Sequence, residues 1–382
     1  MYISHLNLVN YRNYPELELD IPKGLILLYG DNAQGKSNFI EAIYLLSIAK
    51  SYRASNERET LKLNHGITSD NGYVLGVFHN DTDKLRVMID MRLMPSQNDI
   101  NKKILKKDIT LNGLHVSAST LLGNINAVLF TVDDIELIVG SPSVRRRFLD
   151  ILICRIDKRY LRALQKYQRV IFQRNHLLRL IRDRKASVSE LEFWNESIIY
   201  EGSYITMKRK LVVDELVSIV VPIYEKLTNA GEKISLSYQP GLLTETFEFE
   251  DLQRKFRTTV YDMLDREISQ GVSQHGPHRD DVKILLNGMD SSVFASRGQA
   301  RTLALSLKLS EGNILHKETL QSPIILLDDV FSELDESRKN LILDHVSGNE
   351  QVLVSSSDRN VIAPERVSYL TKLIIDNGSV RQ

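Results

Sequence analysis

The chain has 382 residues, 42% apolar and 26% charged, and its 49 basic and 49 acidic side chains give a formal net charge of zero. These values are typical of a soluble globular protein with more than one domain, and the lack of any long apolar run excludes a membrane-spanning helix. The single cysteine, Cys154, excludes an internal disulfide and a multi-cysteine metal site.

The N-terminal region predicts two strands, a glycine-rich loop and a helix. Its first residues lack the basic and apolar pattern of a secretory signal, so we expect a cytoplasmic protein. Acidic and apolar residues alternate over 16–21, as in a half-exposed strand, and the apolar run 25–29 is typical of a strand buried on both faces. The loop 30–37 follows, and the apolar spacing over 38–46 predicts a helix after it.

The loop after the buried strand fits the pattern G-x-x-x-x-G-K-[ST] of a phosphate-binding loop. It reads Gly30-Asp31-Asn32-Ala33-Gln34-Gly35-Lys36-Ser37. Its glycines let backbone N–H groups surround the β- and γ-phosphates, Lys36 reaches the same phosphates, and the Ser37 hydroxyl is a magnesium ligand. The strand before the loop and the helix after it favour ATP binding over an ordinary glycine turn.

The middle of the chain predicts a β-rich stretch followed by a helical hairpin. Two strands are expected between 73 and 91, and Asn112-Gly113 is a hairpin signal. Apolar residues at helical spacing predict a long helix over 144–185. A capping box at Ser187–Glu190 starts a second, antiparallel helix, in which Pro222 marks a kink or the end.

The predicted helix 144–185 carries a local basic surface. Between Ser141 and Lys185, fourteen basic residues outnumber three acidic ones in a chain that is neutral overall. Such a concentration of positive charge attracts the phosphate backbone of DNA, although a charged helix can also be a solvated face. We expect DNA contacts from Arg145, Arg146, Arg147, Arg155 and Arg159.

The C-terminal third predicts further strands and helices. Two acidic residues follow the last apolar strand. In the order strand, helix, strand, helix, strand, these elements are expected at 234–238, 252–268, 282–286, 296–309 and 324–327. A carboxylate at the end of a buried strand is suited to magnesium, so we assign Asp328 to the metal. The next residue, Asp329, is assigned to orienting or deprotonating the attacking water, although paired acids after a strand also occur as turn caps.

A second phosphate-binding candidate begins the helix 296–309. It reads Ser296-Arg297-Gly298-Gln299-Ala300. A helix N-terminus presents free N–H groups and a positive dipole end to an anion, whereas the alternative is an N-capping serine alone. The phosphate loop and this signature each precede a helix N-terminus. Two such N-termini can approach the same γ-phosphate more easily when they belong to two facing chains than when both belong to one chain. We therefore expect Ser296, Gly298 and Gln299 to act on the nucleotide of a second copy.

These motifs resemble the ATP-binding-cassette heads of the SMC-like repair ATPases. The resemblance rests on the phosphate loop, the Ser296–Ala300 signature, Asp328-Asp329 and the turn Ser332–Asp335. Within that group the chain is similar, over nearly its whole length, to the RecF family of bacterial recombination mediators. The further segments that carry this similarity are Asn10–Tyr14, Gly140–Asp150, Gly276–Asp281 and Asp328–Asp335.

The resemblance implies an α/β fold, namely an ABC-type P-loop ATPase head with a mixed sheet and a β-rich flank, plus an inserted α-helical lobe. The ATPase lobe would comprise 1–140 and 269–382, and the helical DNA-binding and dimerisation lobe 141–268. Arg12 and Asn13 would flank the nucleotide.

The resemblance also implies a function. ATP and Mg²⁺ would be the cofactors, and a weak ATPase activity would serve as a conformational switch. The protein would dimerise on ATP at single-strand/duplex DNA junctions and help RecR and RecO to load RecA in recombinational repair, replication restart and the SOS response.

Some positions leave alternatives open. Val132-Asp133-Asp134 stands where relatives show Pro-Glu-Asp, so either acid could sense magnesium. Ser355–Asp358 lacks the switch histidine of transporter cassettes, which leaves γ-phosphate sensing to hydroxyls. His278 and Arg279 are either structural partners of the following acids or contacts for nucleotide or DNA. The alternative functions are the nucleotide-binding subunit of a membrane transporter and a short SMC-type structural ATPase.

Overall fold

The computed structural model describes residues 1–382 apart from 65–66, 97–98, 229–230, 243, 363–369 and 382. The chain divides into two compact units: unit 1 comprises Met1–Asp134 with Glu311–Gln382, and unit 2 comprises Ile135–Ser310. Within the described part of the chain, no helix combines the length and the apolar character needed to cross a bilayer.

The first sheet of unit 1 is antiparallel and has the strand order β2-β1-β6-β7-β8-β9. Its strands are β1 (Tyr2–Tyr11), β2 (Tyr14–Asp20), β6 (Asn71–His79), β7 (Lys84–Ser96), β8 (Asp99–Leu111) and β9 (Leu114–Val116). Asn112 and Gly113 join β8 to β9 with φ values of 52° and 83°, both positive as in a type I′ turn. The predicted Asn-Gly hairpin is therefore confirmed.

The second sheet of unit 1 has the order β10-β14-β15-β3-β16-β17 and is parallel except for its last pair. Its strands are β10 (Ala127–Thr131), β14 (Ile324–Asp328), β15 (Gln351–Ser356), β3 (Gly24–Tyr29), β16 (Leu370–Asp376) and β17 (Ser379–Arg381). The apolar run of β3 lies between β15 and β16, and Ile26, Leu27 and Leu28 are fully buried. This confirms the prediction of a strand buried on both faces.

The helix α1 (Lys36–Ile48) lies at the centre of the core of unit 1. Eleven of its 13 residues are buried, and its apolar side chains share one cluster with strands of both sheets. A helix that is buried on nearly every side holds its N-terminus rigidly. The shorter elements around this core are η1 (Glu57–Thr60), β4 (Leu63–Asn64), β5 (Ile67–Thr68), α2 (Ala118–Leu121), η2 (Val132–Ile135), η5 (Val330–Glu333) and α11 (Glu336–Val346).

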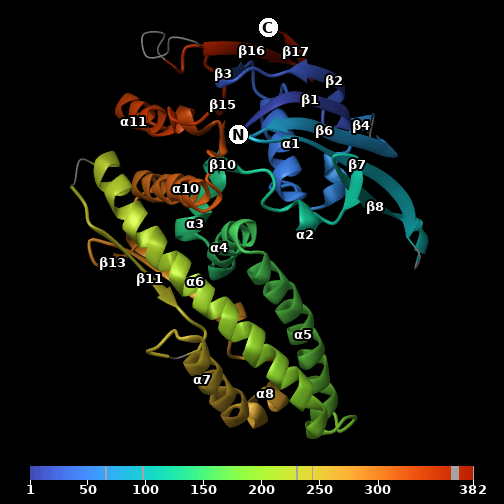
Figure 1. Ribbon diagram of the computed structural model, residues 1–382, viewed down its shortest axis with the longest axis vertical. Helices are drawn as coiled ribbons and strands as arrows, with labels where there is room; N and C mark the ends of the chain where they lie inside the picture. Colours follow the sequence, from blue (N-terminus) through green and yellow to red (C-terminus); the bar gives the residue numbers. More distant parts are fainter. Residues whose placement is uncertain (65–66, 97–98, 229–230, 243, 363–369, 382) are drawn as a thin grey trace. The chain divides into compact units, whose positions relative to one another are not determined.

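Unit 2 is built on three helices: α4 (Pro142–Ile156), α5 (Lys158–Arg182) and α6 (Glu192–Leu227). Figure 1 shows α5 and α6 packed beside each other. The predicted single helix over 144–185 is wrong, because Asp157 takes an extended conformation and its side chain accepts a hydrogen bond of 2.9 Å from Tyr160 N, which caps α5.

Proline 222 does not end the second helix of the hairpin. The capping box at Ser187 and Glu190 is present and leads through η3 (Val188–Leu191) into α6. The helix then continues past Pro222 to Leu227. Val220 and Ile223, on either side of the proline, are buried, so packing outweighs the one backbone hydrogen bond that proline removes.

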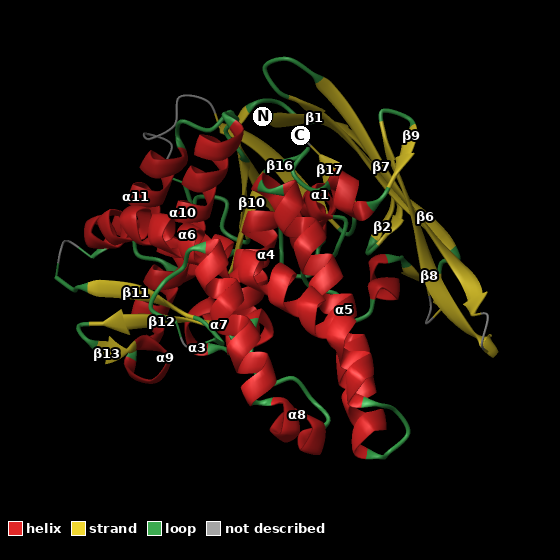
Figure 2. Cartoon of the chain, turned by 60° about the horizontal axis from the view of Figure 1, so that its bottom comes forward, coloured by secondary structure: helices red, strands yellow, loops and turns green. Residues whose placement is uncertain are grey.

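The rest of unit 2 comprises a small antiparallel sheet and short helices (Figure 2). The sheet contains β11 (Ile234–Gln239), β12 (Asp281–Leu286) and β13 (Met289–Asp290). The remaining elements are α3 (Glu136–Val139), α7 (Phe249–Asp262), α8 (Leu264–Gln270), η4 (Pro277–Arg279), α9 (Ser291–Phe294) and α10 (Arg297–Thr319), which begins in unit 2.

The compact units differ from the sequence-based division of the chain in one respect. Residues 269–310, which we assigned to the ATPase lobe with the signature, group with the helices of unit 2. The strands β12 and β13 explain this grouping, since they pair with β11 within unit 2. The division into an ATPase lobe and a DNA-binding lobe stays a functional prediction.

Candidate nucleotide site and basic surface

The phosphate loop connects β3 to α1, as the sequence predicts. Gly35 is the N-cap of α1 with a φ of 118°, a conformation that residues with a side chain rarely adopt. An added Cβ at Gly35 would lie 2.6 Å from Asn13 Nδ2. Both the backbone conformation and the close approach of Asn13 therefore require glycine at this position.

Two turns of unit 1 support the loop through Gln34. Its carbonyl oxygen accepts hydrogen bonds from Asn13 Nδ2 at 2.8 Å and from Gly378 N at 3.0 Å. Its side-chain Oε1 accepts one from Asn377 N at 2.6 Å. Asn13 Oδ1 in turn accepts from Asn38 Nδ2 at 2.8 Å. The structure thus places Asn13 and Gln34 among the supports of the loop.

Lys36 lies inside the curve of its own loop. Its Nζ donates to the carbonyl oxygens of Gly30 and Asp31, each at 2.7 Å. Burial lowers the pKa of Lys36, while the negative charges of Asp329 and Asp328 act in the opposite direction. Lys36 therefore interacts electrostatically with both predicted acids, and its ammonium group can exchange the two carbonyl oxygens for phosphate oxygens.

Asp328, at the end of β14, accepts three hydrogen bonds from hydroxyl groups. Its Oδ1 accepts from Ser37 Oγ and Ser355 Oγ, and its Oδ2 from Tyr52 OH, each at 2.8 Å. Ser355 is the direct neighbour of Asp328 in the pairing of β15 with β14. The predicted meeting of the phosphate loop and Asp328 is present, and the structure adds Tyr52, for which the sequence gives no signal.

Asp329 follows β14 in the left-handed conformation, with a φ of 55°. Its backbone N donates to Ser355 Oγ at 3.0 Å, so Ser355 connects both acids. Such a conformation is uncommon for a residue other than glycine and is typical of positions that a site holds under strain. It turns the chain sharply after the strand, at the edge of the sheet that carries the loop.

The residues present fit a magnesium ion that takes most of its ligands from a nucleotide. The described residues contain no group of three or more His, Cys, Asp or Glu side chains placed to hold a metal by themselves. Magnesium is typically held by one or two protein oxygens together with phosphate oxygens and water. Ser37 and Asp328 provide that pair of oxygens.

Arg12, which by resemblance would flank the nucleotide, forms a two-point ion pair with Glu41 of α1. Its Nε and Nη2 donate to the two carboxylate oxygens of Glu41 at 2.8 and 2.7 Å, and its Nη1 donates to Glu59 O at 2.7 Å. Glu41 is fully buried and also accepts from Ser51 Oγ. The guanidinium of Arg12 therefore joins α1 to η1.

The signature segment lies in unit 2, at the start of α10. Ser296 Oγ accepts from Gln299 N at 3.2 Å, and Gln299 Oε1 accepts from Ser296 N at 2.8 Å, which is a capping box. Gln299 Nε2 also donates to Glu232 Oε1 at 2.6 Å. Gly298 is exposed, and an added Cβ there would meet no atom within 4 Å.

Two of the open positions have clear local partners. Asp134 Oδ2 accepts from Thr131 N at 2.6 Å and so caps the turn after β10, whereas Asp133 is exposed. His278 Nδ1 lies 2.7 Å from Tyr167 OH and its Nε2 lies 3.1 Å from Ser273 O. Because a carbonyl only accepts, His278 is protonated at Nε2 and accepts the Tyr167 hydroxyl at Nδ1.

Burial lowers the pKa of His278 to about 4, in keeping with this neutral form. Arg279 Nη2 also donates to Ser273 O, at 3.3 Å. The contacts of His278 favour the structural alternative for this residue, whereas the side chain of Arg279 is exposed.

The predicted DNA-binding arginines divide into structural and exposed residues. Arg145 makes two hydrogen bonds to the carboxylate of Asp281, at 2.7 and 2.9 Å, and Arg146 donates to Asp280 O at 2.7 Å. Arg155 is only 3% exposed. Arg145 and Arg146 therefore connect parts of unit 2, and Arg155 is buried within it.

Arg147 and Arg159 are exposed. Arg159 lies over the ring of Tyr204, 4.0 Å from its centroid, and donates to Tyr200 OH at 3.1 Å. The sequence shows the local excess of positive charge but not which arginines face solvent.

Comparisons with known proteins match the whole chain. The family model for the RecF/RecN/SMC N terminal domain matches residues 2–377. The DNA replication and repair protein RecF of Staphylococcus carnosus is 36% identical over 383 residues, covering 100% of both chains. The RecF protein of Lachnoclostridium phytofermentans is 35% identical over 384 residues, covering 99% of this chain and 100% of the relative.

Solved structures agree with the sequence matches. A structure of the recombination mediator protein RecF with ATP superposes with a TM-score of 0.87 at 33% identity, covering 100% of this chain and 97% of the other. The Smc head domain of Pyrococcus furiosus, with an extended coiled coil and bound to the C-terminal domain of ScpA, gives 0.54 at 17% identity, covering 100% and 95%, which shows a shared fold.

These matches confirm the predicted α/β head of the ABC-type ATPases. The agreement extends over both units, because the matched residues include the phosphate loop, the helices of unit 2 and Asp328. The chain therefore belongs to the RecF family, within the wider group of RecF, RecN and SMC N-terminal domains.

Proposed function

We propose that the protein is an ATP-dependent DNA-binding protein of recombinational repair and replication restart, in which ATP joins two copies and slow hydrolysis releases them. The observation that carries the proposal is the 2.8 Å hydrogen bond between Ser37 Oγ and Asp328 Oδ1, which joins residues 291 positions apart. The curated relatives, which are DNA replication and repair proteins, and the RecF structure with ATP support it.

The chain's own residues would prepare the nucleotide in three ways. Ser37 and Asp328 would hold the Mg²⁺ of MgATP, which neutralises charge on the β- and γ-phosphates when it is bound. Lys36 would exchange the carbonyls of Gly30 and Asp31 for phosphate oxygens. Asp329, fixed through its backbone by Ser355, would orient or deprotonate the attacking water.

The second copy would complete the site through its signature. Helix α10 presents an exposed N-terminus at Ser296 and Gly298, and a helix N-terminus stabilises an anion. In the single chain the Ser296 hydroxyl caps its own helix. On dimerisation, it would donate to the γ-phosphate of the partner's nucleotide, so that ATP itself becomes part of the dimer interface.

The substrate would be a single-strand/duplex DNA junction, and the partners RecR, RecO and RecA. The solved relative is described as a recombination mediator of the RecFOR pathway, which supports these partners. Arg147 and Arg159 are the predicted contacts that remain exposed. Further exposed cations along α5, including Arg162, Arg169 and Arg179, extend the same basic surface.

Oligomeric state tests this proposal most directly. Analytical ultracentrifugation with and without ATP, and with and without gapped DNA, should show an ATP-dependent dimer for the wild type. Lys36→Ala should abolish ATP binding, while Ser296→Arg should bind ATP and remain monomeric. Ser218→Arg, at an exposed position of α6, is the matched control and should dimerise. An ATP-dependent dimer of Ser296→Arg would contradict the sandwich of two copies.

A further inference from the structure

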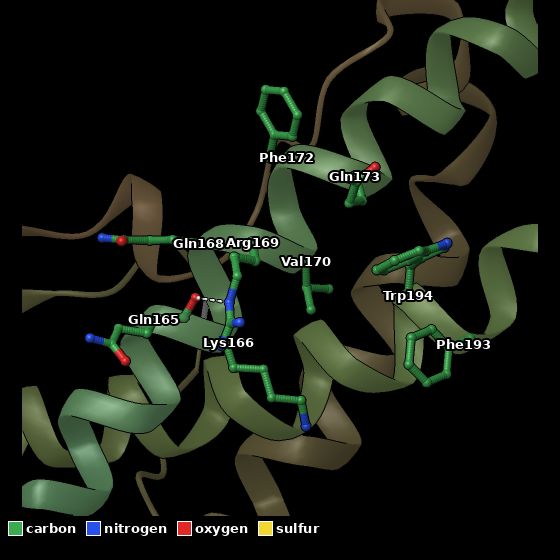
Figure 3. A pocket seen from close by; sticks show the side chains of 9 residues that line it. All are labelled: Gln165, Lys166, Gln168, Arg169, Val170, Phe172, Gln173, Phe193 and Trp194. Carbon is green, nitrogen blue, oxygen red and sulfur yellow. Dashed lines mark hydrogen bonds between the residues drawn. The ribbon is translucent and has the colours of Figure 1, made fainter. Parts of the chain in front are cut away.

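Unit 2 carries an open groove that none of the predicted motifs uses. It lies between α5 and the start of α6, and Figure 3 shows the side chains that line it. Its volume is about 1140 Å³. We call it the aromatic groove and define it by its lining residues: Gln165, Lys166, Gln168, Arg169, Val170, Phe172, Gln173, Phe193 and Trp194.

The aromatic rings of the groove are unusually exposed. Phe172 and Phe193 are each 67% exposed. Trp194 meets Phe193 edge to face, with 5.1 Å between the ring centroids, and it also packs against the small apolar cluster around Leu178. Trp194 is thus held in place while part of it lines the groove. Exposed aromatic rings gathered around one cavity are typical of a binding site.

The polar side chains of the groove are cations and amides. No acidic residue is among the nine that line it, and three of them are glutamines. Arg162, Lys166 and Arg169 follow each other at helical spacing along one face of α5. Lys166 is 51% exposed and forms an ion pair of 2.8 Å with Glu201, whereas Arg169 Nε donates to the Gln165 carbonyl. The charged residues that line the groove are therefore both cations, and the rest of its lining is largely apolar.

We propose that the aromatic groove binds unpaired bases of single-stranded DNA. Bases stack on aromatic rings and are attached to phosphates, so a strand needs rings and cations side by side. Glutamine amides can donate to and accept from base edges. A duplex keeps its bases stacked inside the helix and does not offer their faces, so the groove selects single strands. The inference rests on the proposed DNA-binding function. It places the single-stranded arm of the DNA junction in the aromatic groove.

The emission of Trp194 tests the inference directly, because Trp194 is the single tryptophan of the chain. The full-length protein, in the presence of ATP and Mg²⁺, is titrated with an oligothymidylate and with a blunt two-strand duplex that contains the same number of nucleotides. Stacked bases should quench the emission, and the duplex should not. The quench should weaken as salt is added, because Arg169 and Lys166 face the phosphates.

The double variant Phe172→Ala/Phe193→Ala should lower the affinity for oligothymidylate about tenfold or more. The matched control is Tyr261→Ala, which removes a 45% exposed aromatic ring on α7 and should leave the affinity unchanged. Circular dichroism checks that each variant is folded.

The outcomes separate the inference from the proposed function. The inference is supported if all proteins still bind duplex DNA and ATP and only the double variant loses binding of oligothymidylate. An unquenched Trp194, or equal affinities for all variants, overturns it while duplex and ATP binding still stand. Quenching by an acidic, apolar peptide in place of oligothymidylate would overturn it in favour of a protein partner. If the wild-type protein binds neither ATP nor duplex DNA, the proposed function itself is contradicted.

Discussion

The Arg12 guanidinium and the Glu41 carboxylate form a two-point ion pair, at 2.8 and 2.7 Å, in which the carboxylate is fully buried. Removing one partner of such a pair leaves a charge in the core without compensation. We expect Arg12→Met to lower the free energy of unfolding by about 3 kcal/mol, measured by urea denaturation.

The double variant Arg12→Met/Glu41→Leu is the control for this pair. It removes both charges, so it should be more stable than Arg12→Met alone. If the double variant loses at least as much stability as the single variant, the loss comes from packing around Arg12 and not from the unpaired carboxylate.

Asn13 should act on nucleotide affinity through the loop. Its amide holds the Gln34 carbonyl at 2.8 Å and lies against Gly35. We expect Asn13→Ala to weaken ATP binding about tenfold, since one hydrogen bond is worth roughly 1 kcal/mol and the loop also loses its support. Asn377→Gly keeps the backbone donor to Gln34 and tolerates the positive φ of 44°, so it should bind ATP normally. Calorimetric titration measures both.

Ser355 should matter for hydrolysis more than for binding. Its hydroxyl connects Asp328 to the backbone of Asp329. Ser355→Ala should slow ATP hydrolysis about tenfold or more, as loss of a supporting contact to a metal ligand does, while ATP still binds. Ser356→Ala is the matched control, because its hydroxyl accepts from Asp358 N and not from the site acids. Similar hydrolysis rates in both variants would argue against the role of Ser355.

His278 should make unit 2 sensitive to acid. Its pKa is lowered to about 4 by burial, so in mildly acidic solution the unfolded chain binds a proton that the folded chain does not. The contribution of neutral His278 to the free energy of unfolding is therefore fully present above the ordinary histidine pKa. It is lost as the pH falls toward 4. Between about pH 7.5 and about pH 5 this costs the wild type about 2 kcal/mol.

The variant His278→Gln isolates this contribution. Urea denaturation of both proteins at the two pH values should show that the variant loses about 2 kcal/mol less than the wild type. Equal losses would mean that His278 is not buried in its neutral form.

Local signals predict much of the fold, and they fail where tertiary contacts decide. The Asn-Gly turn at Asn112 and Gly113 folds as predicted, and Asn287 and Gly288 form a second turn of this kind, at φ values of 50° and 80°. No clear alternation predicts β1, because a register shift between Ile3 and His5 interrupts its period of two. The break at Asp157 is hidden for a similar reason, since apolar spacing continues from α4 into α5.

For the site, sequence predicts the residues with fixed motif spacing. The phosphate loop and Asp328 meet as expected. Tyr52 joins Asp328 across 276 positions, and no local pattern marks such a contact. Arg12 lies in a motif, yet only the fold brings Glu41 close enough to take its guanidinium. Motifs thus locate the site, while its supports depend on which side chains the two sheets and α1 bring together.

The position of β3 links the order of synthesis to the order of folding. This strand pairs on one side with β15 and on the other with β16, both encoded near the end of the chain. A growing chain can complete the contiguous residues of unit 2 while β3 still lacks both neighbours. The proposed nucleotide site is therefore complete only after β15 and β16 have left the ribosome, and we expect a nascent chain without them not to bind ATP.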